Sequence, residues 1–185
     1  MADHIHDLFE ILMMSMALGM DAFSLSIGIG LHGIRRQAAL RLAGTIGVFH
    51  VLMTLTGLYI GLAMQGLLGA VAQGFGALLL CGMGLHMLYT SVFAPQQVAM
   101  TGTGGIALLA FSASVSIDAL SVGFSLGLRS TAYGLVSAGA FGIAGGILCL
   151  AGLYIGGKAG GHIGRIGELA GALILFGYGV HLLAG

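Results

Sequence analysis

The stretch SMALGMDAFSLSIGIGL, from Ser15 to Leu31, aligns without gaps on the stretch SASVSIDALSVGFSLGL, from Ser112 to Leu128. The two copies share a serine, the pair Asp-Ala, a second serine and a closing Gly-Leu. The motif GLYIG also occurs twice, beginning at Gly57 and at Gly152, so it follows each copy at a similar interval. Such duplication predicts that the chain consists of two related halves.

The apolar segments of the chain are long enough to cross a bilayer, whose hydrocarbon core is about 30 Å thick. Hydrophobic residues make up 58% of the 185 residues and charged residues only 6%, whereas about a quarter of the residues in soluble domains are charged. The alternating pattern of a barrel is absent, and helices satisfy their own backbone hydrogen bonds in lipid. We therefore predict an all-α polytopic membrane protein, with six transmembrane helices in a single membrane domain, residues 1–185. The predicted helices are Leu8 to Leu31, Leu42 to Ala63, Leu67 to Phe93, Gly104 to Leu128, Ala132 to Gly156 and Ile166 to Leu183.

The two predicted repeats, residues 8–93 and 104–183, contain three helices each. Because an odd number of spans reverses the direction of the chain, the second repeat should be inverted relative to the first. Inverted repeats are an architecture of transporters, which bind their substrate at the repeat interface. Close packing between the repeats is predicted at the glycines that bound the two GLYIG motifs, namely Gly57, Gly61, Gly152 and Gly156.

The basic residues predict how the chain is oriented, because Lys and Arg collect in cytoplasmic loops. Only Arg129 falls on the side opposite to the other five, which are Arg35, Arg36, Arg41, Lys158 and Arg165. The prediction is a multi-pass protein with both termini outside the cytoplasm. The first helix is expected to be retained rather than cleaved as a signal peptide, because residues 1–7 are acidic rather than basic.

Composition and motifs exclude several classes of function. Six acidic and six basic residues cancel, and no basic run suggests nucleic acid as a partner. The segment from Gly152 to Ala159 approaches a Walker A motif but lacks the final Ser or Thr, so we reject nucleotide binding. Cys81 and Cys149 lie within apolar runs and are expected to be core residues. We predict neither an enzyme nor a bound cofactor.

Asp21 and Asp118 are the charged residues placed deepest in the predicted helices. At 1.5 Å per residue each lies roughly 20 Å along its helix, and opposite helix directions would bring the two carboxylates together near the middle of the bilayer. A carboxylate there costs at least ~2.5 kcal/mol, and the predicted spans contain no Lys or Arg to offset it. The pair is therefore predicted to bind a divalent cation or protons. The structural alternative is that two neutral carboxyl groups join the helices by hydrogen bonds.

Hydroxyl groups accompany both aspartates at helical spacing. Ser24 and Ser121 each follow an aspartate by three positions, and Ser114 and Ser125 lie on the same face as Asp118. Oxygen ligands of this kind suit Mg²⁺, Ca²⁺ and Mn²⁺. For each serine, close packing or a hydrogen bond to its own helix is an equal alternative.

Glycine and histidine residues provide weaker candidates. Three glycines would allow the first helix to unwind near its aspartate and free carbonyl groups for an ion: Gly19, Gly28 and Gly30. His50 is a candidate ligand or proton carrier, or else a buried histidine paired with a hydroxyl group. His86 and His181 occupy matching positions near helix ends, where anchoring at the membrane interface is expected.

The segments SMALGMDAFSLSIG and SVSIDALSVGFSLGL, together with GELAGALILFGYGVHLL near the end of the chain, resemble the bacterial manganese exporter (MntP type) family of the lysine exporter superfamily. The likeness covers essentially the entire chain. It implies export of Mn²⁺ across the cell inner membrane, with the family's essential aspartates at Asp21 and Asp118 and an acidic position at Glu168. This chain departs from the family pattern at His50, where Glu or Gln is usual, and an imidazole there would favour Zn²⁺ or Cd²⁺.

The resulting hypothesis is a secondary exporter of divalent metal ions that works by alternating access, with Mn²⁺ as the transported substrate and protons as the counter-ion. The residues predicted to bind the metal are Asp21, Asp118, Ser24, Ser121, His50 and Glu168. The alternatives are a non-transporting membrane scaffold, an exporter of Zn²⁺ or Cd²⁺, and an exporter of an amino acid. The protein is expected to lie in the lipid bilayer, and the sequence leaves its oligomeric state open, a homodimer included.

Overall fold

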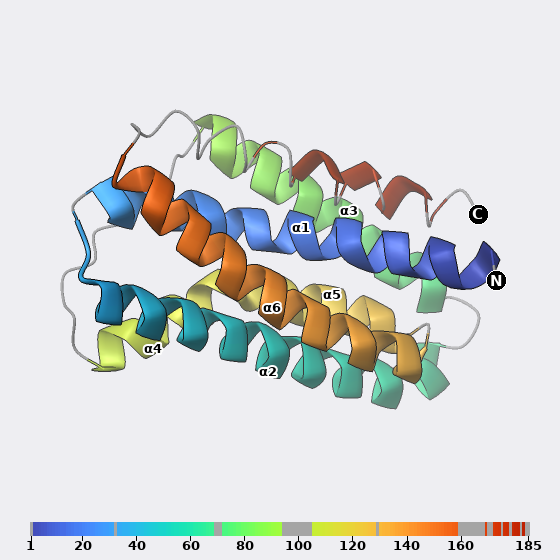
Figure 1. The fold of residues 1–185 in the computed structure, drawn as a ribbon. Coiled ribbons are helices and arrows are strands. Elements are labelled where there is room, and N and C mark those ends of the chain that lie inside the picture. The colour runs from blue at the N-terminus through green and yellow to red at the C-terminus, as the bar shows by residue number, and fades with distance from the viewer. Residues whose placement is uncertain are drawn as a thin grey trace.

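The computed structural model describes residues 2–31, 33–68, 72–93, 105–128 and 130–158, together with Leu169 and nine residues between 172 and 183. Every regular element within these residues is a helix, as the sequence predicts (Figure 1). The helices are α1 (Ala2–Leu31), α2 (Arg36–Leu68), α3 (Ala72–Phe93), α4 (Gly105–Val115), α5 (Ile117–Gly127) and α6 (Thr131–Gly156).

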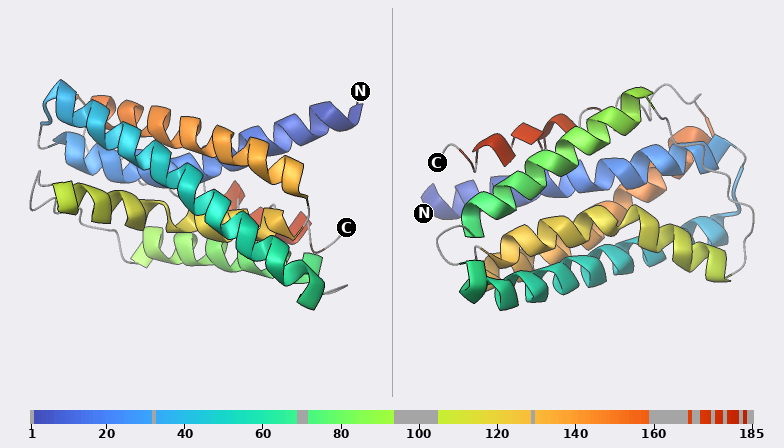
Figure 2. Two further views of the ribbon diagram at one scale, coloured as in Figure 1. Left: turned by 90° about the horizontal axis from the view of Figure 1, so that it is seen from below. Right: turned by 180° about the vertical axis from the view of Figure 1, so that it is seen from behind.

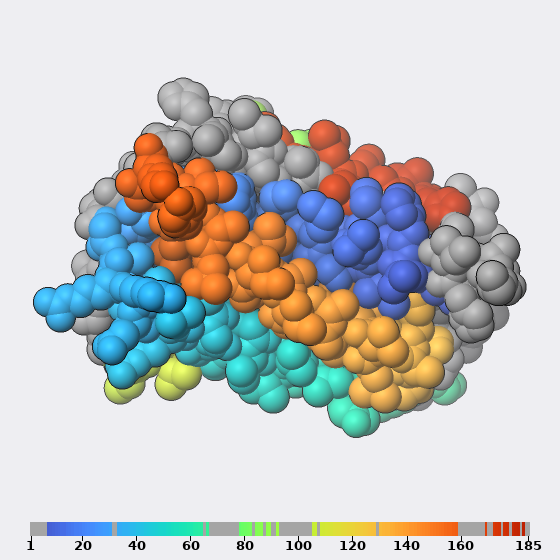
Figure 3. Space-filling model, in the orientation of Figure 1, coloured from blue at the N-terminus to red at the C-terminus, as the bar shows by residue number. Residues whose placement is uncertain are grey.

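The helices form an elongated bundle in which neighbours in space are distant in sequence (Figures 1 and 2). Helix α1 packs along α6, while α2 packs along α5 and α6 and also contacts α4. Helix α3 packs against α5. Figure 3 shows α6 crossing the face of the bundle between α1 and α2. The predicted first and second repeats are therefore interleaved rather than separate.

The predicted fourth helix is broken. Helices α4 and α5 meet at Ser116 with a bend of 43°, where the backbone has φ −102° and ψ 5°. The N–H of Ser116 donates to the carbonyl of Ala113 and the N–H of Ala119 to the carbonyl of Ser116, both at 3.1 Å. This three-residue spacing tightens the chain. Serine hydroxyls compete for helix carbonyls and bend helices, and the hydroxyl of Ser114 donates to the carbonyl of Phe111 at 2.8 Å.

The matching part of α1 is continuous from Ala2 to Leu31, so the expectation that its glycines unwind near Asp21 is wrong for this structure. Gly19 serves instead as a packing position, because a Cβ there would collide with the side chain of Leu148 on α6. The break at Ser116 and the intact helix at Gly19 occupy equivalent positions of the two sequence copies. The two copies thus have different backbone conformations.

Three or four of the six predicted spans agree with long apolar helices of the described chain. Three helices are long and apolar enough to cross a membrane, within Asp7–Gly30, Arg36–Met64 and Thr131–Gly156. The bent pair Leu108–Val115 and Ile117–Gly127 makes a fourth if it counts as one span. Helix α3 lies where the third span is predicted, and the described residues of 172–181 are helical. The third and sixth spans stay predictions.

The outer surface of the bundle is rich in large apolar side chains, as expected for helices in contact with lipid. Exposed apolar residues of α2 and α6 include Val48, Leu52, Tyr59, Ile60, Leu135, Val136, Ile143, Ile147 and Tyr154. Inside, Met14, Leu58, Val122 and Phe141 belong to one buried cluster that joins α1, α2, α5 and α6. Cys149 is buried in a second cluster, as predicted, and Cys81 is half-buried.

The four glycines of the GLYIG motifs lie where helix backbones touch. A Cβ added at Gly57 or Gly61 of α2 would collide with a carbonyl oxygen of α5, that of Leu120 or Phe124. A Cβ at Gly152 or Gly156 of α6 would collide with a carbonyl oxygen of α1, that of Phe23 or Ile27. The prediction that these glycines mediate close helix packing is confirmed. Contacts of this kind let backbones pack closely where lipid supplies no hydrophobic driving force between helices.

Candidate functional site

The bend between α4 and α5 places Asp118 in the first turn of α5. A carboxylate at this end of a helix interacts favourably with the helix macrodipole. Asp21 lies within the continuous helix α1, and the side chains of both aspartates are half-buried. The two predicted ligands therefore sit in unlike backbone settings, although their sequence contexts match.

His50 of α2 is completely buried, at 0% exposure, and faces the bend. Its Nδ1 atom lies 2.9 Å from the hydroxyl oxygen of Ser116 and 3.0 Å from the carbonyl oxygen of Ile46 in the preceding turn. His50 is thus buried and paired with a hydroxyl group. This contact links α2 to the bend, two residues before Asp118.

The other side of the His50 ring faces α1 and α6. The ring approaches the backbone of Leu18 on α1, and a Cβ added at Gly145 of α6 would lie 3.2 Å from it. Among the described residues, the buried Nε2 atom of His50 and the buried hydroxyl of Ser112 have no hydrogen-bond partner. Buried polar atoms without partners are uncommon and often mark functional sites. His50 therefore lies at the crossing of the helices that carry both aspartates.

His86 of α3 lies close enough to Asp118 to interact with it, a proximity that the sequence analysis did not predict. Interfacial anchoring was the expected role; the side chain of His86 is exposed, and its imidazole interacts electrostatically with Asp118. The signal in the sequence is the segment Gly-x-Gly-x-His, which ends at His86 and again at His181.

The predicted hydroxyl ligands differ in their placement. Ser24 and Ser121 are half-buried, as are the aspartates they follow. Ser114 is exposed and lies beyond the bend from Asp118, so the expectation that it shares the aspartate's face is wrong. Ser125 is buried, and its hydroxyl donates to the carbonyl of Ser121 in its own helix at 3.2 Å. The predicted ligand Glu168 lies outside the described residues.

The candidate ligands do not form a complete metal shell in this conformation. Within the part of the chain that the structure describes, no three His, Cys, Asp or Glu side chains lie together so that they could hold a metal ion. Asp21, Asp118 and His50 therefore do not converge on one point that could hold an ion. Binding of an ion between them would require a movement of the helices.

Comparison with known proteins gives the family. The family model described as "Putative manganese efflux pump" matches residues 33–183. The chain belongs to the MntP family. Proteins named "Putative manganese efflux pump MntP" from Bacillus thuringiensis subsp. konkukian (strain 97-27), Bacillus cereus (strain Q1) and Bacillus anthracis (strain CDC 684 / NRRL 3495) are each 38% identical over 176 residues. These alignments cover 95% of this chain and 96% of each relative. No solved structure matches the chain.

The range matched by the MntP family model includes the residues next to the bend between α4 and α5. The matched range, 33–183, includes His50, His86 and Asp118 but begins after Asp21. The alignments to the Bacillus relatives extend over nearly the whole chain. The MntP resemblance expected from the two Asp-Ala motifs is thus confirmed at the level of the family.

Proposed function

We propose that this protein exports divalent metal ions, Mn²⁺ first among them, across the cytoplasmic membrane by alternating access in exchange for protons. The observation that carries the proposal is the position of His50, which is completely buried. It bonds Ser116, two residues before Asp118, and approaches the backbone of Leu18, three residues before Asp21. The names of the relatives support efflux of manganese. The acidic residues, the buried imidazole and the adjacent hydroxyl groups supply ligands that suit a divalent transition metal.

The hydrogen bonds of His50 agree with a role as a metal ligand. When Nδ1 carries its proton and donates it to the carbonyl of Ile46, Nε2 presents its lone pair to the buried space where it has no partner among the described residues. Metal-binding histidines commonly use this arrangement, in which the second ring nitrogen is fixed by a backbone carbonyl. The ligand set we propose is Asp21, Asp118, His50, Ser24 and Ser121, with Glu168 as a further acidic residue on the ion's path.

Alternating access in this proposal rests on an inverted repeat, which reciprocal contacts support. Gly47 and Gly142 occupy equivalent positions of the two halves. A Cβ at Gly47 would lie 2.8 Å from the carbonyl oxygen of Gly142, and a Cβ at Gly142 would lie 2.9 Å from that of Gly47. His50 likewise touches Gly145, its own equivalent. Equivalent residues touch each other only beside a two-fold axis, so the proposed axis passes next to His50.

Paired contacts farther from this axis follow the same rule. Gly57 meets Leu120 as Gly152 meets Phe23, and these are equivalent pairs in the sequence alignment. The break in one half and the continuous helix in the other half then represent one of two related conformations. Exchanging the shapes of the halves would open the site to the opposite side.

Exchange for protons would remove the electrical cost of export. Moving two positive charges outward against an inside-negative potential costs about 4.6 kcal/mol per 100 mV, since each charge contributes ~2.3 kcal/mol. Two protons moving inward cancel this term. The two carboxyl groups provide two proton-binding positions, a number that equals the charge of one divalent ion.

Transport by purified protein in liposomes tests the proposal. We expect Mn²⁺ to move out of the compartment that faces the predicted cytoplasmic side, and an opposing proton gradient to accelerate this movement about tenfold or more. Mn²⁺ flux would be followed with an internal metal-sensitive dye and proton flux with a pH-sensitive dye. Mn²⁺ flux that does not respond to the proton gradient would contradict exchange, and absence of flux for any divalent ion would contradict transport itself.

Substitution of His50 by glutamine is expected to change metal selectivity more than stability. Glutamine retains a polar group of similar length but lacks the imidazole nitrogen that Zn²⁺ prefers, so the ratio of Zn²⁺ to Mn²⁺ affinity should fall about tenfold. Calorimetry with both ions measures this ratio. Thr56→Ala on the same helix is the control, because the Thr56 hydroxyl is exposed and bonds only its own helix. An equal loss for both ions would contradict a direct contact between His50 and the metal.

A further inference from the structure

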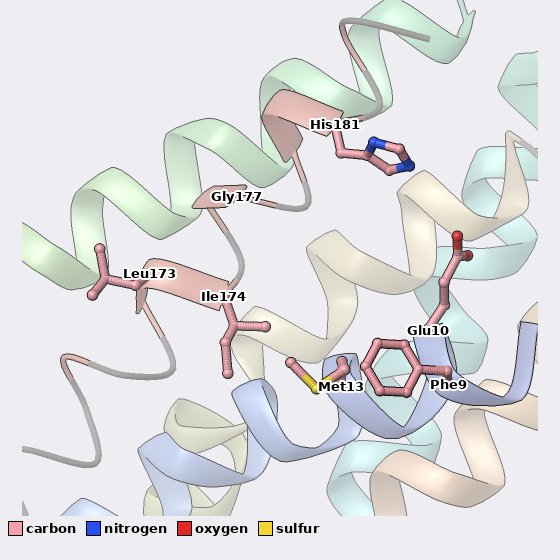
Figure 4. Close-up of a pocket in the computed structure, with 7 residues that line it drawn as sticks. All are labelled: Phe9, Glu10, Met13, Leu173, Ile174, Gly177 and His181. Atoms are coloured by element: carbon pink, nitrogen blue, oxygen red, sulfur yellow. The ribbon is translucent and has the colours of Figure 1, made fainter. Parts of the chain in front are cut away.

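A separate cavity lies near the N-terminal end of α1, away from the bend (Figure 4). Its volume is about 290 Å³, and it is formed between α1 and described residues of 172–181. Figure 4 shows Glu10 and His181 at one end of the cavity and the aliphatic side chain of Leu173 at the other. Met13 adds a thioether to the wall. One water needs only ~10–15 Å³ of such space, so the cavity has room for an ion with several waters.

Glu10 is an acidic residue that the fold holds in place inside this cavity. Its side chain is only 8% exposed, although sequence position puts it within the first turns of the helix. The hydroxyl of Tyr133, at the start of α6, donates to the Oε2 atom of Glu10 at 3.1 Å. A buried carboxylate is energetically unfavourable unless it is paired. The hydrogen bond from a second helix fixes the direction of the carboxylate.

The geometry points to a second divalent-cation site in this cavity, with Glu10 and His181 as ligands. Figure 4 shows the carboxylate of Glu10 and the imidazole of His181 directed into the same space from opposite walls. Carboxylate and imidazole together suit Mn²⁺, Fe²⁺, Co²⁺ or Zn²⁺ better than Mg²⁺ or Ca²⁺. Two protein ligands leave the remaining positions to water, which gives a site of low affinity and fast exchange. The Tyr133 hydroxyl orients Glu10 as outer-shell partners orient other metal ligands.

The internal duplication does not repeat this pair of ligands. The residue equivalent to Glu10 in the second copy is Ala107, whereas His181 is matched by His86. The internal duplication therefore places no second carboxylate at the opposite end. That the ion bound in this cavity is the transported ion rests on the proposed function. If both termini lie outside the cytoplasm, the ion meets Glu10 and His181 after it leaves Asp21 and Asp118, so the cavity is an exit site.

Paramagnetic broadening by Mn²⁺ alone tests this site. In full-length protein labelled at its seven histidines, we expect the His181 imidazole resonances to broaden on addition of Mn²⁺. Glu10→Gln keeps the acceptor for the Tyr133 hydroxyl but removes the charge, so the Mn²⁺ concentration for half-broadening should rise about tenfold or more. Tyr133→Phe leaves both ligands in place and should give a smaller rise. Thermal unfolding of each variant measures whether the fold is kept.

The central aspartates provide the control that separates the two sites. In the double variant Asp21→Asn and Asp118→Asn, broadening of His181 should persist while transport is lost. Loss of the His181 broadening in this double variant would overturn the second site, because the ion seen there would belong to the central one. An unchanged half-broadening concentration in folded Glu10→Gln would overturn it as well. Failure of the proposed function has a different outcome, namely transport that survives in the double variant.

Discussion

Loss of Mn²⁺ transport by about 100-fold or more is the expected result of replacing both Asp21 and Asp118 by asparagine. A hydrogen bond or contact to a charged group contributes ~1.5–3 kcal/mol, so removal of two carboxylates from the ion should cost about 3–6 kcal/mol, and each 1.4 kcal/mol is a factor of ten. Asparagine keeps the shape of the side chain and one oxygen ligand. The measurement is the initial rate of Mn²⁺ flux into or out of liposomes that contain equal amounts of folded protein.

The single variants refine this prediction. Asp118 lies beside the bend, where His86 also interacts with it, so Asp118→Asn should disturb the site at least as strongly as Asp21→Asn. The matched control is Ser114→Ala, because the Ser114 hydroxyl is exposed and bonds within its own helix. If Asp118→Asn and Ser114→Ala transported Mn²⁺ at the same rate, the carboxylate would have no part in transport. A charge-conserving Asp118→Glu should recover part of the lost activity.

The hydropathy pattern predicted two helix ends correctly, at places where an apolar run stops. The predicted end of the first helix at Leu31 and that of the fifth at Gly156 coincide with the ends of α1 and α6. Helix α2 instead extends from Arg36 to Leu68, beyond the predicted run of Leu42 to Ala63. A hydropathy pattern reports which residues prefer lipid, and a helix can continue into the polar region on either side.

The bend at Ser116 was not predictable from the same pattern, because hydropathy does not change across it. The bend depends on local serine hydrogen bonds and on the contact with His50, which comes from a distant part of the chain. The repeated Asp-Ala-x-Ser motif marks the neighbourhood of Ser116, because Asp118 follows Ser116 by two positions. The sequence also suggested unwinding in the wrong copy, since glycine spacing alone favoured α1. Which copy bends is decided by tertiary contacts, not by local propensity.

The close contacts between helices lead to the second large effect, on stability. Gly57→Ala should lower the unfolding temperature strongly, because the added Cβ would collide with the carbonyl oxygen of Leu120 and lie 2.7 Å from the backbone nitrogen of Phe124. These are backbone atoms of α5 and cannot rotate away. Overpacking typically costs about 1–3 kcal/mol, and for a chain of this size each kcal/mol lowers the unfolding temperature by roughly 2–4 °C. A fall of about 2–12 °C in detergent solution is expected.

Gly44→Ala provides a control in the same helix, because a Cβ at Gly44 meets nothing within 4 Å. Its unfolding temperature should stay within about 2 °C of the parent or rise, since alanine favours helix more than glycine does. Gly152→Ala should resemble Gly57→Ala, because Gly152 makes the equivalent contact with the carbonyl of Phe23. If Gly57→Ala were as stable as Gly44→Ala, α2 and α5 would not pack this closely. If Gly152→Ala alone were harmless, the two halves would not share a packing scheme, and alternating access by exchange of their shapes would lose its structural basis.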